Sequence, residues 1–180
     1  NFAKLAVTPG LLDTLLRTFK PEFAGKLHLA TPTEVQLGLA PFSIPVQGFS
    51  PDAAKAKPVH ATLTIPGKAS VEGLASIFDE KSAMRALSSA GLDGLNVEAD
   101  IPLGAFVASN DAPPTKHTLS ATLSTKLLAN GGRISDVAGT MSGDFNAGAP
   151  VGPLSVNLDL AQIDTAAAER AMGQDSLLTS

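Results

Sequence analysis

The sequence predicts an α+β fold: a curved, antiparallel, meandering sheet of six to eight strands, with two or three amphipathic helices covering one face. Three observations predict it. Many short stretches alternate apolar residues with small or polar ones, which is typical of strands with one apolar face. A few stretches have helical spacing instead. These helices separate groups of strands and do not follow every strand, which favours an antiparallel over a doubly wound parallel sheet.

Length and composition narrow the class of protein. We expect one domain over residues 1–180, and because the chain starts at Asn1, a mature protein or a piece of a longer one. The aromatic residues are eight Phe, with no Trp or Tyr, and the net charge is −4. Nucleic-acid binding is therefore not expected, since it needs clustered cations and stacking aromatics. The absence of cysteine excludes disulfides and thiolate chemistry.

The strongest strand pattern covers His117 to Leu160, which predicts three consecutive strands. The first alternates through Leu119 and Leu123, and the second follows a turn at Asn130-Gly131-Gly132. The third runs from Leu154 to Leu160. We expect the apolar side of this unit to be buried as the core of the domain.

The first part of the chain predicts an edge strand over 1–7 and then a helix. Thr8 can cap the free N–H groups of that helix, and Pro9 fits its first position. The helix would end before Pro21. Its apolar face would consist of Leu11, Leu12, Leu15, Leu16 and Phe19.

Two strands are predicted next, at Lys26–Ala30 and Thr33–Val46. In the longer one the apolar parity changes at Ala40-Pro41, which indicates a bulge. Two short strands around a kink are the alternative. A further strand, Val59–Ile65, would stop at Pro66-Gly67, although the alternation resumes at Ala69 and Val71.

The remaining elements follow from spacing and turn residues. Leu74–Ser89 has helical spacing and would end at Gly91. Asp93-Gly94 would then turn the chain into a strand, Leu95–Leu103. At the C-terminal end, Asp164 would cap a helix over Thr165–Met172.

No residues form a recognisable catalytic or metal-binding motif. His28, His60 and His117 fall in separate strands without ligand spacing, so surface histidines are favoured over a metal site. Ser142, in Gly139-Thr-Met-Ser-Gly143, lacks the spacing of a nucleophile elbow. No glycine-rich phosphate loop or calcium loop is present. The sequence therefore predicts a protein that is not an enzyme, with no cofactor and no metal.

The alternating strands define one candidate site. An aliphatic sheet face is usually core, but on a long curved sheet with few helices it can form an apolar groove. The candidate ligand-binding residues on this face are Leu37, Leu39, Leu63, Val97, Ile101, Leu119, Leu123, Val156 and Leu158.

The order of these features resembles AsmA-like domains, bacterial envelope proteins built from repeating β-grooves. The resemblance rests on the helix Thr8–Phe19, the run Leu95-Asn-Val-Glu-Ala-Asp-Ile101, and Leu119-Ser-Ala-Thr-Leu-Ser-Thr125 followed by Gly139-Thr-Met-Ser-Gly143. It implies a curved sheet with an apolar interior, a role in lipid transport or outer-membrane homeostasis, and a place on the periplasmic side of the envelope. Against that family, 180 residues would be a fragment, without a membrane anchor.

Two functions of different classes are therefore expected. The first is a non-enzymatic envelope domain whose apolar β-groove associates with or transports lipid, with lipid or membrane-associated proteins as partners. The second is a structural or interaction domain of a larger assembly, with a closed core and no ligand, which pairs through an exposed strand edge.

Overall fold

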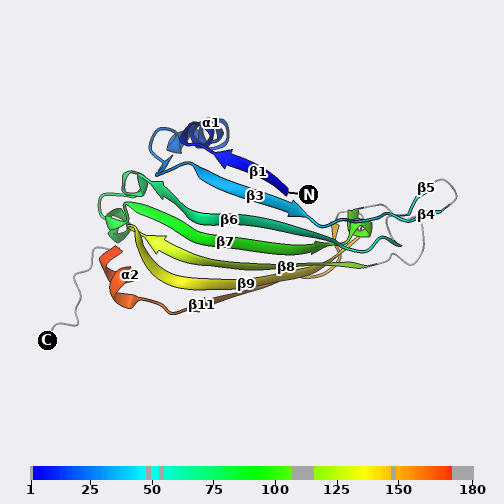
Figure 1. Ribbon diagram of the computed structural model, residues 1–180. Helices are drawn as coiled ribbons and strands as arrows, with labels where there is room; N and C mark the ends of the chain where they lie inside the picture. The colour runs from blue at the N-terminus through cyan, green and yellow to red at the C-terminus, as the bar shows by residue number, and fades with distance from the viewer. Residues whose placement is uncertain (1, 48–49, 53–54, 107–115, 147–148, 172–180) are drawn as a thin grey trace.

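The computed structural model describes residues 2–47, 50–52, 55–106, 116–146 and 149–171, and most of them form one antiparallel sheet that does not close on itself (Figure 1). Its path is β1-β3-β6-β7-β8-β9, and β10 and β11 both pair with β9, while β2 pairs with β6. The strands are β1 (Phe2–Val7), β2 (His28–Leu29), β3 (Thr33–Leu39), β6 (Val59–Glu72), β7 (Ser89–Ile101), β8 (His117–Ala129), β9 (Gly132–Asn146), β10 (Ala149–Pro150) and β11 (Ser155–Ala161). The expected antiparallel meander is confirmed, with nine strands where six to eight were expected.

The long strands continue through residues that were expected to stop them. Pro66-Gly67 lies inside β6, where the pairing with β7 shifts register between Ile65 and Lys68. Asp93-Gly94 lies inside β7, at a second shift toward β8, and Gly94 has φ of 68°. The predicted stop and turn are therefore wrong, because the extra residues are accommodated as bulges within paired strands. Figure 1 shows these strands bending along their length.

β3 is shorter than predicted. The amide of Ala40 donates to the carbonyl oxygen of His60 at 2.9 Å, and Pro41 then has no N–H to continue the ladder. The single bulged strand Thr33–Val46 is therefore wrong, and of the two short strands in the alternative only the first, which ends at Leu39, is present as predicted, because residues 40–45 form no strand. Val46 belongs to a separate two-stranded sheet, β4 (Val46–Gln47) and β5 (Ser50–Pro51).

Both helix starts follow the sequence. In α1 (Pro9–Phe19) the hydroxyl of Thr8 accepts a hydrogen bond from the amide of Leu11 at 3.2 Å, with Pro9 in the first turn. In α2 (Thr165–Ala171) a carboxylate oxygen of Asp164 accepts from the amide of Ala167 at 2.8 Å. The expected last residue of this helix, Met172, lies outside the described residues.

The helix predicted at Leu74–Ser89 is wrong. This connection contains two short 3₁₀ turns, Leu74–Ser76 and Ala83–Ala86, and β7 has already begun at Ser89. The amide of Gly73 donates to the carbonyl oxygen of Ser88 at 3.1 Å, so the two ends of the segment meet. A straight helix of that length would separate its ends by about 24 Å. The predicted stop, Gly91, lies in β7, where an added Cβ would lie 2.5 Å from the carbonyl oxygen of Ala69.

The expectation that helices cover one face of the sheet is also wrong for the part of the chain that the structure describes. The main contacts of α1 are with β2 and a 3₁₀ turn at Pro21–Phe23, and those of α2 are with the ends of β8 and β9. Neither helix is long enough to cross the wide sheet, since 11 residues span about 16 Å. The described core is correspondingly small: Val59, Ala105, Leu128, Ala129, Val137 and Ala171 are its buried hydrophobic residues.

Candidate functional site: an open apolar sheet face

One face of the sheet carries apolar residues in rows that cross the strands, and we name it the apolar face. Cross-strand pairing places the members of each row side by side. The first row is Ala3, Leu37, Leu63, Val97, Leu123, Gly139 and Leu158. The second row is Leu39, Ala61, Ala99, Ala121, Met141 and Val156. Because the side chains of a strand alternate between faces, both rows lie on the same side.

The apolar face extends beyond these two rows in both directions along the strands. On one side Leu5 pairs with Val35, Ile65 with Leu95, and Val137 with Leu160. On the other side Val59 pairs with Ile101, and Leu119 with Gly143. Four rows across six strands measure roughly 24 Å by 20 Å from ordinary sheet spacings. The exposed apolar area is smaller than this footprint of roughly 500 Å², because Val59 and Val137 in the outer rows are buried. Exposed apolar patches of a few hundred Å² are often functional.

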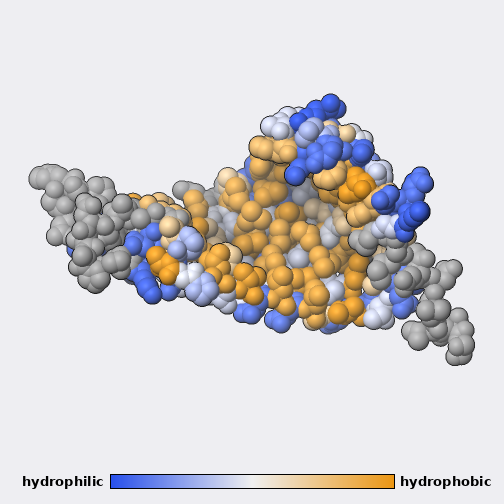
Figure 2. All heavy atoms as spheres, turned by 180° about the vertical axis from the view of Figure 1, so that it is seen from behind, coloured by the Kyte–Doolittle hydropathy of each residue, from blue (hydrophilic) through white to orange (hydrophobic). Residues whose placement is uncertain are grey.

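The apolar face is open to solvent. Leu37 is 44% exposed at one side of the sheet, and Leu158 is 64% exposed at the other. The residues between them, such as Val97 and Leu123, are half-buried by their neighbours. Figure 2 shows this face as a broad apolar hollow, with α1 raised at its upper margin. The sequence-based expectation that the apolar side of His117–Leu160 is a buried core is therefore wrong for Met141, Val156 and Leu158, which are exposed, although Val137 on the same side is buried.

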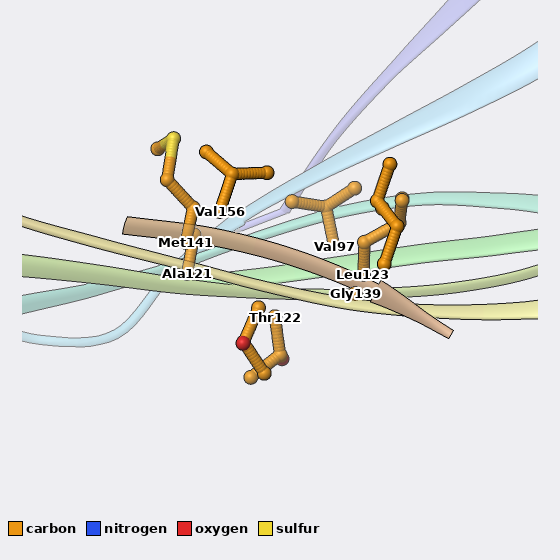
Figure 3. A pocket seen from close by; sticks show the side chains of 9 residues that line it. Val97, Ala121, Thr122, Leu123, Gly139, Met141 and Val156 are labelled. Atoms are coloured by element: carbon orange, nitrogen blue, oxygen red, sulfur yellow. The ribbon is translucent and has the colours of Figure 1, made fainter. Parts of the chain in front are cut away.

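Two shallow hollows lie on the apolar face. One, of about 210 Å³, is formed by β7, β8, β9 and β11, and the side chains of Val97, Leu123, Met141 and Val156 rise from the sheet into it while Thr122 points to the opposite side (Figure 3). The other, of about 260 Å³, is formed by β3, β6 and β7 around Leu37, Leu39 and Leu63. Val97 lines both, so the two hollows are adjacent along the same rows.

Glycines in β9 shape the hollow near the edge of the sheet. An added Cβ on Gly139 would lie 2.8 Å from Cδ2 of Leu158, and one on Gly143 would lie 2.3 Å from Cδ2 of Leu154. The side chains of β11 and the segment before it therefore lie across β9 where it has no side chains of its own. A larger residue at position 139 would displace Leu158 and change the hollow that both residues line, whereas one at position 143 would displace Leu154 outside it.

The opposite face of the same strands is polar. One of its rows is Gln36, Thr64, Asn96, Ser124, Ala138 and Asp159. His60 and Asp100 pair on this face, with Nδ1 of His60 3.0 Å from Oδ1 of Asp100. The side chains of the polar face can hydrogen-bond to water, so the apolar face is the one that needs a partner.

The nine residues expected to line a groove all lie on the apolar face. Seven belong to its first two rows, and Ile101 and Leu119 belong to the row nearest β10. Sequence reasoning missed the small residues between them, Ala61, Ala99, Ala121 and Gly139, and also Met141. For the three alanines the signal was present, because each has the same parity as the expected residues in its own strand. β9 contributed no expected residue, so Gly139 and Met141 are placed on the face only by their pairing with β8 and β11.

The histidines and carboxylates do not form a chemical centre among the described residues. His28 pairs with Glu72 at 3.3 Å, at the far end of β6 from His60, and Ser142 lies inside β9. The described ranges contain no group of three or more His, Asp or Glu side chains with the arrangement of a metal site. They also contain no helix with the length and apolar content of a membrane span.

No family model, no curated protein and no solved structure matches this chain. A function for this chain is therefore inferred from the geometry of the apolar face.

Proposed function

We propose that this chain is a non-enzymatic domain whose apolar face holds the acyl chains of lipids. The observation that carries the proposal is the exposure of the rows around Leu37, Met141 and Leu158, which cross the whole sheet. Leaving such a surface in water costs about 25 cal/mol for each Å². An occupant without polar groups would remove that cost along the entire row.

Acyl chains suit this surface better than a compact ligand. The hollows are shallow, they adjoin at Val97, and they are lined by aliphatic side chains and backbone. A small polar ligand needs hydrogen-bonding groups to fix its orientation, and the hollow beside β11 presents almost only apolar atoms. A flexible hydrocarbon chain needs only apolar area, and it can lie along the rows without a closed pocket.

The cellular setting belongs to the same proposal. A carrier of lipid would act between membranes or at a membrane surface, with lipid and membrane-associated proteins as partners. The likeness of the strand and helix runs to AsmA-like domains supports the periplasmic side of a bacterial envelope as that setting. Lipid transport along the face is the wider role that this proposal includes.

The test begins with lipid that co-purifies with the protein. Organic extraction of the purified chain followed by mass spectrometry is expected to yield phospholipid or fatty acid in near-stoichiometric amount. Met141→Asp would place a charge in the apolar face and should lower the bound lipid at least tenfold, because a charge is costly to bury beside hydrocarbon. Met141 is exposed, so the substitution should leave the fold intact.

Ser124→Asp is the matched control, because it adds the same charge to the polar face, between Asn96 and Ala138. It should leave the bound lipid unchanged. Protein that carries no lipid and takes up no fluorescent fatty acid would contradict the proposal. Equal loss of lipid in both variants would contradict the role of the apolar face.

A further inference from the structure

The edge strand β11 has the features of a strand that pairs with another chain. All seven of its residues are exposed, and in the described part of the chain it pairs with β9 alone. Its register with β9 is regular from Ser155 to Ala161, so it has no bulge. It contains neither Lys nor Pro, the residues that usually protect an edge from further pairing. The free side of β11 therefore offers an unprotected row of backbone donors and acceptors.

The residues of β11 are chemically symmetric about Leu158. Small residues stand at both ends, apolar residues flank the polar positions, and the two polar positions adjoin the central leucine. The equivalent positions are Ser155 and Ala161, Val156 and Leu160, and Asn157 and Asp159. Such a segment is complementary to a second copy of itself when the two run antiparallel.

We propose that two copies of this chain pair through β11, antiparallel, about a two-fold axis that is normal to the sheet and passes between the two Leu158 residues. Leu158 then lies opposite Leu158 of the second copy, and Val156 lies opposite Leu160. Asn157 lies opposite Asp159, so an amide donor faces a carboxylate and no like charges lie directly opposite each other. The contact is isologous, as in most homodimers.

The two-fold axis also keeps the apolar faces on one side. An axis normal to a sheet reverses the direction of its strands but does not turn its faces over. The rows that end at Val156 and Leu158 would therefore continue into the second copy, and the exposed side chains at this edge would gain apolar neighbours. This pairing does not depend on what the apolar face binds.

The opposite edge is a poorer partner for β11. Six successive antiparallel pairings join β1 to β11 along the path of the sheet, so these two strands run in the same direction. A translated copy would bring them together in parallel, which is the slightly less stable arrangement. β1 also carries Lys4, which protects that edge.

Single cysteines test the register, because the chain has no cysteine of its own. Leu158→Cys should form a disulfide-linked dimer on mild oxidation, since directly opposite residues of an antiparallel pair lie within disulfide reach. Val156→Cys alone should remain unlinked, whereas a mixture of Val156→Cys and Leu160→Cys should cross-link. Absence of the Leu158→Cys dimer, or equal cross-linking of Val156→Cys, would overturn the proposal.

Charge variants test the pairing without a covalent bond. Sedimentation of the unmodified chain should give a reversible species of twice 18.3 kDa. Asn157→Asp should weaken dimerisation roughly tenfold by setting like charges opposite, and Asn157→Lys should strengthen it in a salt-dependent way. Ser124→Asp, two strands inside the edge, should change nothing. A monomer at all concentrations, or the same response to both Asn157 variants, would disprove the dimer.

Discussion

Leu158 lies over Gly139, and an added Cβ at that glycine would be 2.8 Å from the Cδ2 atom of the leucine. β11 is an edge strand, and at this contact one of its side chains packs on the strand beside it. The position of Leu158 on the apolar face therefore depends on residue 139 being a glycine.

Gly139→Ala should displace Leu158 at a cost of about 1 kcal/mol or less in the free energy of unfolding, because the end of a leucine is free to move. Binding of a fluorescent fatty acid should weaken, since the displaced side chain fills the hollow. Adding Leu158→Ala should restore stability to that of Leu158→Ala alone. Denaturant unfolding measures this cycle, and additive effects would show that the two residues do not interact.

Gly91→Ala is the contrasting substitution. There the new Cβ would lie 2.5 Å from the carbonyl oxygen of Ala69, and a backbone atom in a paired strand cannot move aside. We expect a loss of about 2–3 kcal/mol in stability, larger than that of Gly139→Ala. Thermal unfolding of the two variants side by side gives the comparison, and equal midpoints would contradict it.

Asn130 joins the β8–β9 turn to the connection between β6 and β7. Its Oδ1 accepts hydrogen bonds from the amides of Ser88 and Ser89, at 2.7 and 3.2 Å, and its Nδ2 donates to the carbonyl oxygen of Ala86 at 3.0 Å. Its φ of 48° is in the left-handed region. The side chain holds in place the segment that sequence spacing wrongly predicts as a helix.

Asn130→Ala should therefore lower stability by about 1–3 kcal/mol, from lost hydrogen bonds and backbone strain. Asn130→Gly removes the hydrogen bonds but tolerates the positive φ, so it should cost less. Asn130→Asp keeps the acceptor and should cost least. Urea unfolding that ranks the three in another order would refute this role.

Helix α1 should depend mainly on local interactions, because none of its residues is buried and Phe19 is 73% exposed. Thr8→Ala removes its capping hydroxyl and should destabilise the helix by about 1 kcal/mol. Amide exchange in α1 should accelerate while exchange in β7 and β8 stays unchanged. A matching acceleration in the sheet would show that the helix and the sheet unfold together.

The contact between α1 and the turn after it should weaken in acid. The hydrogen bond from Arg17 to Asp13 lowers the pKa of the Asp13 carboxyl, and the amide of Gly25 also donates to it, at 3.1 Å. A lowered pKa means that the charged form is the stabilising one. The stabilisation is therefore present above the unfolded value of about 3.9 and is lost as the pH falls through the folded pKa.

The protection factor of the Gly25 amide against exchange should fall as the pH is lowered through the folded pKa of Asp13, which lies below the unfolded value of about 3.9. Asp13→Asn should show fast exchange at neutral pH already and little further change in acid. Unchanged protection of Gly25 in the variant would mean that the carboxylate does not hold this turn.

Much of the fold follows from short-range pattern. Alternation identifies the long strands, Thr8 and Asp164 mark the helix starts, and Asn130-Gly131 marks the hairpin turn. The misassigned parts depend on distant partners. Pro66-Gly67 is a bulge only because β7 pairs on both sides of it, and the segment after Gly73 cannot be a helix because Ser88 closes it.

In the candidate site, too, short-range pattern predicts some features and distant contacts decide the others. Parity alone places Leu37, Val97 and Leu158 on one face, whatever lies above that face. Whether it is core or surface depends on a second layer, and α1 has the right pattern for such a layer but contacts β2 at the margin. Amphipathic spacing specifies which side is apolar and does not specify what meets it.

An open meander also has no fixed width. A closed sheet ties its diameter to its number of strands, whereas here each strand pairs with its neighbours and the two margins stay unconnected. Inserting or removing one hairpin would change the breadth of the hydrocarbon-compatible surface by about 10 Å and leave the other pairings as they are. In this architecture the breadth of the apolar face is therefore set by the number of strands, and it can change by one hairpin at a time.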